Sequence, residues 1–144
     1  MKTTIIGLLL LATASVNAQE KAQTYQLADA PRYSEETGYG YDLVATPEKG
    51  SKAPFFFSVR VPDGNYQVTV RLGSKKQAGV TTVRGESRRL FIDNLATKKG
   101  QFVDETFIIN KRNPRISEKE SVRIKPREKA KLNWDDKLTL EFNG

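Results

Sequence analysis

A period-two alternation of apolar and polar residues limits the folds open to this chain more than any other feature. In residues 54–61 and again in 66–72 every second residue is apolar, with polar residues between them and Phe56 as an exception. Successive side chains of a β-strand point to opposite faces, so each run places one apolar face against a core. The sequence PDGN at 62–65 is typical of a turn. These patterns predict a β-hairpin over residues 54–72.

Similar short runs recur along most of the chain, bounded by Gly, Pro, Asn, Asp or charged residues. None of them shows the 3.6-residue period of an amphipathic helix. Strands without helical crossovers favour an antiparallel sandwich or jelly roll, with a closed barrel as the alternative. We therefore predict an all-β fold, an antiparallel β-sandwich, with further strands at residues 24–28, 39–45, 79–84, 88–93, 101–110, 120–125 and 137–142.

The first 18 residues are typical of a secretory signal peptide. Lys2 precedes an apolar run at 5–12, and VNA at 16–18 supplies small residues at the usual cleavage spacing. A membrane anchor is the alternative, but the run is much shorter than the roughly 20 residues that span a bilayer. We expect cleavage after Ala18, a secreted or periplasmic location, no membrane span, and a single domain over residues 19–144.

The charge balance is basic. The chain carries 24 Lys and Arg against 17 Asp and Glu, a formal net charge of +7, spread over several loops. Such a balance favours acidic partners, and for an exported protein these are a uronate-bearing polysaccharide or a cell surface. A solubilising surface without a specific ligand is the alternative. We do not expect a nucleic-acid partner, because most aromatic residues occupy the alternate strand positions that face the core. No nucleic-acid-binding motif accompanies the basic residues.

The chain contains no histidine and no cysteine, which excludes the usual catalytic triads. No Gly-x-Ser-x-Gly elbow and no Gly-Asp-Ser block occurs. The carboxylate pairs 35–36, 104–105 and 135–136 are adjacent residues, and adjacent residues of a strand point to opposite faces. A glycosidase therefore remains an alternative only if two carboxylates from separate strands converge.

Metal binding is open only to hard cations. Zinc normally takes Cys or His ligands, and neither is present. We expect no cofactor, although Asp29, Glu35, Asp42 or Asp135 could contribute oxygen ligands to a structural Ca²⁺.

The best candidates for carbohydrate contacts are Trp134, Arg84, Arg88 and Asp135. Aromatic faces pack on sugar rings, and Arg suits a uronate carboxylate. Trp134 stands in a predicted loop, but packing into a core or a domain interface is the more common role of a lone Trp. Arg88 and Arg89 cannot both point outward from a half-buried strand, so one of them is expected to be structural, paired with Glu86 or another acid.

Several strings resemble the N-terminal accessory domain of bacterial rhamnogalacturonan acetylesterase-like proteins. They are YSEETGYGY at 33–41, PFFFSVRVPDGNY at 54–66, TTVRGESRRL at 81–90, VRIKPRE at 122–128 and LNWDDKLTLEF at 132–142. The resemblance implies a galactose-binding-like sandwich that precedes an SGNH (GDSL-type) esterase domain, which removes acetyl groups from pectic rhamnogalacturonan.

The catalytic Gly-Asp-Ser and Asp-x-x-His blocks of that family match nothing in this chain, so the resemblance assigns no catalytic residue here. We expect a secreted, non-catalytic accessory module that binds pectic polysaccharide or supports a downstream esterase domain. A purely structural scaffold that packs on such an esterase is the alternative.

Overall fold

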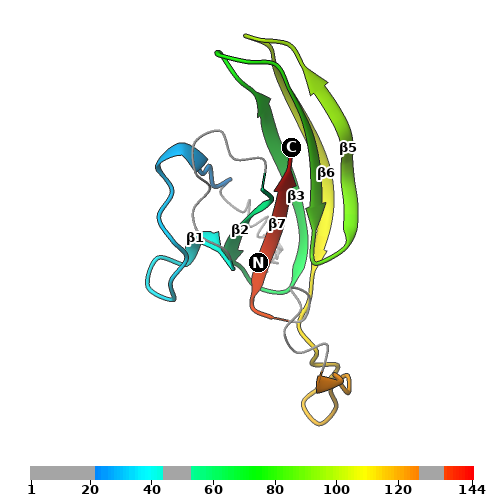
Figure 1. Ribbon diagram of the computed structural model, residues 1–144. Coiled ribbons are helices and arrows are strands. Elements are labelled where there is room, and N and C mark those ends of the chain that lie inside the picture. Colours follow the sequence, from blue (N-terminus) through cyan, green and yellow to red (C-terminus); the bar gives the residue numbers. More distant parts are fainter. Residues whose placement is uncertain (1–21, 44–52, 127–134) are drawn as a thin grey trace, which may run out of the picture.

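The computed structural model describes residues 22–43, 53–126 and 135–144, which form two antiparallel sheets (Figure 1). One sheet has five strands in the order β1-β2-β7-β4-β5, and the other has two, β3 and β6. The nearly all-β architecture with two sheets confirms the predicted β-sandwich. The strands are β1 (Tyr39–Asp42), β2 (Phe55–Arg60), β3 (Gly64–Gly73), β4 (Gly79–Gly85), β5 (Arg89–Thr97), β6 (Phe102–Lys111) and β7 (Lys137–Asn143), with a 3-10 helix η1 at Leu27–Asp29.

The core lies between the two sheets. Alternate residues of the strands point inward, as the period-two pattern requires. Val83 and Ile109 are fully inaccessible, and the rings of Phe91 and Phe107 stack across the layers with centroids 4.4 Å apart. The buried apolar residues of this core are Phe57, Val70, Leu72, Val83, Ile92, Ile109, Leu138, Leu140 and Phe142.

The predicted hairpin over 54–72 is wrong, although both of its strands exist. β2 pairs with β1 and β7, whereas β3 pairs with β6 in the other sheet. The residues between β2 and β3 therefore cross from one sheet to the other. The alternation in each run shows which side chains of the strand face the core. It does not show to which sheet the strand belongs, because strands of both sheets have one face against the core.

Two of the predicted strands do not form. Within 24–28 the chain enters the 3-10 helix, and Tyr25 and Leu27 pack against the core without joining a sheet. Within 120–125 the chain forms an isolated bridge between Ser121 and Arg115 and belongs to none of the seven strands. That segment has exposed side chains, so it lacks the buried face that stabilises a strand.

Some of the predicted features lie outside the described residues. These are the signal peptide at 1–18 and the candidate sugar-binding residue Trp134. Among residues 22–43, 53–126 and 135–144, no helix is long and apolar enough to cross a membrane.

Candidate functional site

The sugar-binding candidates that the structure describes do not assemble into one site. Arg84 forms an ion pair with Glu141, with Nη1 and Oε1 3.4 Å apart. Arg88 is exposed in the β4–β5 turn. Asp135 is half-buried, and its Oδ1 accepts a hydrogen bond from the Lys137 N–H at 3.0 Å. Within the described part of the chain, no hydrogen bond or ion pair connects Arg84, Arg88 and Asp135.

The neighbouring arginine has the structural role expected for one of the pair. Arg89 is half-buried, and its Nη1 donates to the backbone carbonyl of Asn110 at 3.1 Å. The sequence predicted an acidic side chain as the partner of this arginine. The observed partner is a backbone carbonyl of β6. The bond ties the start of β5 to the end of β6.

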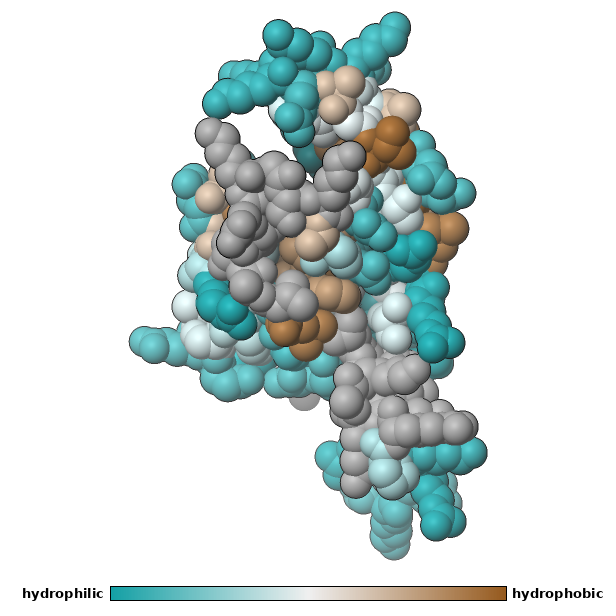
Figure 2. All heavy atoms as spheres, in the orientation of Figure 1, coloured by the Kyte–Doolittle hydropathy of each residue, from teal (hydrophilic) through white to brown (hydrophobic). Residues whose placement is uncertain are grey.

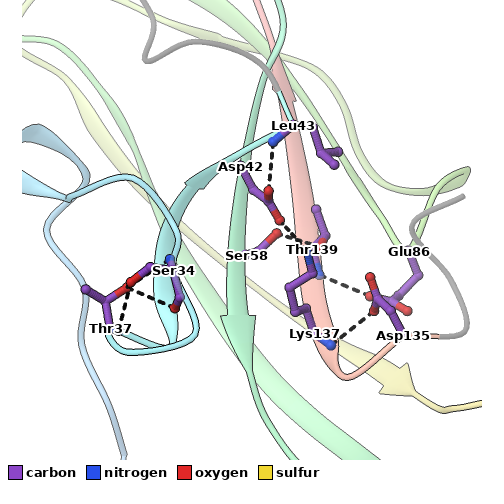
Figure 3. Close-up of polar contacts among 9 residues, drawn as sticks. All are labelled: Ser34, Thr37, Asp42, Leu43, Ser58, Glu86, Asp135, Lys137 and Thr139. Carbon is purple, nitrogen blue, oxygen red and sulfur yellow. Dashed lines mark hydrogen bonds and ion pairs between the residues drawn. The ribbon is translucent and has the colours of Figure 1, made fainter. Parts of the chain in front are cut away.

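Glu86 forms a buried contact with β7 at the point where β4 turns away from it (Figure 3). Its N–H donates to the Thr139 carbonyl and its Oε1 accepts from the Thr139 N–H, both at 3.0 Å. Burial raises the pKa of Glu86 to about 7. The Asp135 charge adds to this shift, while the Thr139 hydrogen bond and the cations Arg89 and Lys111 oppose it. The side chain of Glu86 therefore replaces a strand neighbour for Thr139.

A second polar group, also visible in Figure 3, lies on the outer face of the five-stranded sheet. The hydroxyls of Ser58 and Thr139 are 2.7 Å apart, and the Lys137 Nζ is 2.7 Å from the Asp42 Oδ2. Burial alone would raise the pKa of Asp42, but hydrogen bonds from Lys137, Ser58 and the Leu43 N–H lower it overall. Burial lowers the pKa of Lys137, but the bond to Asp42 outweighs this and raises it.

This polar group is not arranged for nucleophilic chemistry. The side chain of Ser58 is inaccessible to solvent, and a serine nucleophile needs a neighbouring base. Lys137 stays protonated because Asp42 stabilises its charged form, so it cannot accept a proton from Ser58. The Asp42 carboxylate does accept a hydrogen bond from Ser58, but its lowered pKa makes it a weak base. The contacts instead satisfy polar side chains on a covered part of the sheet.

The carboxylates considered as Ca²⁺ ligands do not gather into a metal-binding group within the described residues. Asp42 pairs with Lys137, and Glu35 pairs with Arg60 at 2.7 Å. Among the described residues, no group of three or more carboxylates could hold a metal ion.

A group of exposed lysines lies at the opposite end of the sandwich from Glu86. Two loops meet there, the β3–β4 connection and the β5–β6 turn, and each carries a Lys-Lys pair. The side chains of all four lysines are exposed. Figure 2 shows hydrophilic residues covering the end of the molecule where Figure 1 places these loops. We call this surface the basic tip, and its lysines are Lys75, Lys76, Lys98 and Lys99.

Hydrogen bonds hold the two loops of the basic tip together. The N–H of Gly100 donates to the Ser74 carbonyl at 2.8 Å and so joins one loop to the other. The Gln101 N–H closes a turn on the Lys98 carbonyl at 3.0 Å, with Gly100 at a φ of 79°. Gly100 stands at the turn position that needs a positive φ, which glycine adopts without strain. The backbone that carries the lysines is therefore fixed before any ligand binds.

No carboxylate neutralises the basic tip from within. Residues 73–79 and 97–101 contain no Asp and no Glu. None of the four lysines takes part in an ion pair within the described residues, whereas nearby Asp104 is already paired with Arg71 at 2.9 Å. Like charges that share a small surface create a positive potential, which attracts anions. The basic tip is therefore the candidate functional site.

These lysines were not predicted from the sequence. The available signal was the pair of Lys-Lys dipeptides in turn-forming segments, 23 residues apart, but nothing local shows that the two turns touch. The net charge did indicate an acidic partner, and the basic tip is a surface suited to one. Comparisons of this chain with protein-family models, curated proteins and solved structures find no match, so the geometry of the tip carries the functional argument.

Proposed function

We propose that this chain is an exported, non-catalytic β-sandwich module that binds an acidic polysaccharide through the basic tip. The observation that carries the proposal is a set of four lysines, none of them ion-paired in the part of the chain that the structure describes, on two loops that hydrogen bonds hold together. A polymer with regularly spaced carboxylates can contact several of these ammonium groups at once. Because the loops are ordered beforehand, binding requires little loss of backbone entropy.

The choice of polysaccharide as ligand rests on two expectations from the sequence. The signal-peptide pattern predicts export, and the resemblance implies a pectic substrate whose backbone contains galacturonate. We therefore propose pectic galacturonan as the ligand class, with no cofactor and no catalytic residue in this chain.

A second candidate function, support of an esterase domain, is favoured by a different surface. The segment 112–126 extends away from the sandwich (Figure 1). On it Ile116 is 67% exposed and Val122 38% exposed. Exposed apolar side chains on a projecting segment are suited to packing against another domain.

The experiment for the first proposal is calorimetric titration of the mature chain with oligogalacturonate at two salt concentrations. We expect the double variant Lys98→Glu/Lys99→Glu to weaken binding by about tenfold or more, since each exposed ion pair contributes up to about 1 kcal/mol. Binding should also weaken with salt, because exposed charges are screened.

The control variant is Lys119→Glu/Arg123→Glu on the projecting segment, which changes the net charge equally. Equal weakening by both double variants would mean that net charge, not the basic tip, drives binding. Absence of binding to the unaltered chain at millimolar oligogalacturonate would refute the proposal and favour the supporting role.

A further inference from the structure

Phe102 is an exposed aromatic side chain directly beside the basic tip. It follows the Lys98–Gln101 turn as the first residue of β6, and it is 43% exposed. The alternation of β6 places Phe102 on the outer face, while Val103 and Phe107 point toward the core. The ring therefore lies on the solvent side of the two-stranded sheet.

The strand opposite leaves the ring uncovered. The cross-strand partner of Phe102 is Gly73, and cross-strand side chains are what normally cover an exposed ring. Gly73 has a φ of 135°, and a Cβ there would lie 2.1 Å from the Gln101 carbonyl oxygen. No other residue fits at position 73 without moving the backbone. The close approach of Gly73 to the Gln101 backbone thus keeps position 73 free of a side chain that could cover the ring of Phe102.

Polar side chains that can hydrogen-bond to sugar hydroxyls lie next to Phe102 on the solvent face of the two-stranded sheet. Arg71 and Asp104 form the neighbouring cross-strand pair, with Nε and Oδ1 2.9 Å apart. Their side chains are 70% and 51% exposed. Only the Nε of Arg71 has a hydrogen bond within the described residues, so its two Nη groups face solvent. Phe102 therefore lies between the lysines on one side and an Arg–Asp pair on the other.

We propose that the ring of Phe102 stacks on a pyranose ring, so that the basic tip selects a uronate-bearing sugar chain over polyanions in general. This inference rests on the proposed function. A pyranose has an apolar C–H face and a polar rim, and an aromatic side chain matches the apolar face. Lysines of the basic tip bind the carboxylates, and Arg71 and Asp104 bind hydroxyls. Polyphosphate has charge but no such ring, so it uses the lysines alone.

The test compares two probes, oligogalacturonate and inorganic polyphosphate of similar charge, by titration against the full mature chain. We expect Phe102→Ala to weaken oligogalacturonate binding about tenfold and to change polyphosphate binding less than twofold. Phe102→Tyr keeps the aromatic face and should retain the affinity for oligogalacturonate. Leu90→Ala is the matched control, since Leu90 is an exposed apolar residue of the other sheet, 52% accessible and near the opposite end.

The outcomes separate this inference from the proposed function. If Lys98→Glu/Lys99→Glu weakens oligogalacturonate binding while Phe102→Ala leaves it unchanged, the stacking role is wrong and the proposed function stands. Equal weakening of both probes by Phe102→Ala would also overturn the stacking role. If the unaltered chain binds neither probe, the proposed function itself fails. Thermal unfolding of each variant checks that the sandwich still forms.

Discussion

At the scale of single residues, Glu86 combines burial, charge and an unusual backbone. It is 4% exposed, and both Glu86 and Ser87 have positive φ angles, 49° and 77°. Residues other than glycine adopt this conformation at a cost, so surrounding contacts must hold it. The two hydrogen bonds to Thr139 are those contacts.

The ionisation of Glu86 makes stability depend on pH. Its pKa is about 7 in the folded chain against 4.5 for an unperturbed glutamate, because burial disfavours the carboxylate. Between these values the folded chain binds more protons, so stability falls as pH rises from about 4.5 to above 7. We expect Glu86→Gln, which keeps an acceptor for Thr139, to be more stable than the unaltered chain by about 2 to 3 kcal/mol at pH 8 and to match it near pH 4.5.

Urea unfolding at a series of pH values measures this difference. The control is Glu120→Gln, which removes a carboxyl from an exposed position on the projecting segment. A Glu86→Gln profile with the same slope as the unaltered chain would show that Glu86 is not the titrating group.

Residue identity alone did not reveal what Glu86 contacts. The sequence indicates Glu86 as a partner for the adjacent arginines, but its hydrogen bonds join it to Thr139, 53 positions away. Such a contact depends on the placement of β7 beside β4, which no local pattern specifies. Phe102 is similar, because its exposure follows from a glycine on another strand.

At the scale of elements, positions of strands were more predictable than their partners. Period two is a local property, and it located β1 through β7 to within a few residues. Pairing is non-local, so the sequence pattern predicts a hairpin turn after β2, whereas that short connection joins the two sheets. The segment at 120–125 shows the opposite error, since apolar residues alternate there without a core to face.

Gly73 connects the element scale with the candidate site. We expect Gly73→Ala to destabilise the chain by about 2 kcal/mol or more, because its φ of 135° strains an alanine and the Cβ meets the Gln101 backbone. Displacing that backbone also separates the two loops of the basic tip, so binding of oligogalacturonate should weaken. Gly79→Ala is the control at the start of β4, where a Cβ meets nothing within 4 Å. Equal melting temperatures for the two variants would contradict this account of the tip.

At the scale of the whole molecule, the last strand in the sequence occupies the middle of the larger sheet. β7 lies between β2 and β4 and contributes Leu138, Leu140 and Phe142 to the core. Its contact with β2 joins Ser58 to Thr139, 81 positions apart. Strands so far apart in the sequence can pair only when the long segment between them closes into a loop, so folding depends on that closure. The β3–β6 and β4–β5 pairings bring the two loops of the basic tip together, and the β3–β6 pairing is also long-range, which explains why that site was not visible in the sequence.

This topology predicts that the chain cannot fold without β7. A chain ending at Asp136 loses three core side chains, each worth roughly 1.5 to 3 kcal/mol of burial, and leaves β2 and β4 without their shared neighbour. That loss is comparable with the whole stability of a domain, about 5 to 15 kcal/mol, so we expect no cooperative thermal unfolding by circular dichroism. Adding the peptide 135–144 in excess should restore the transition, because it supplies the missing strand. The same peptide with Leu140→Asp should not, since a carboxylate would replace a buried leucine. A truncated chain that unfolds cooperatively at the original temperature would show that the sandwich closes without its central strand.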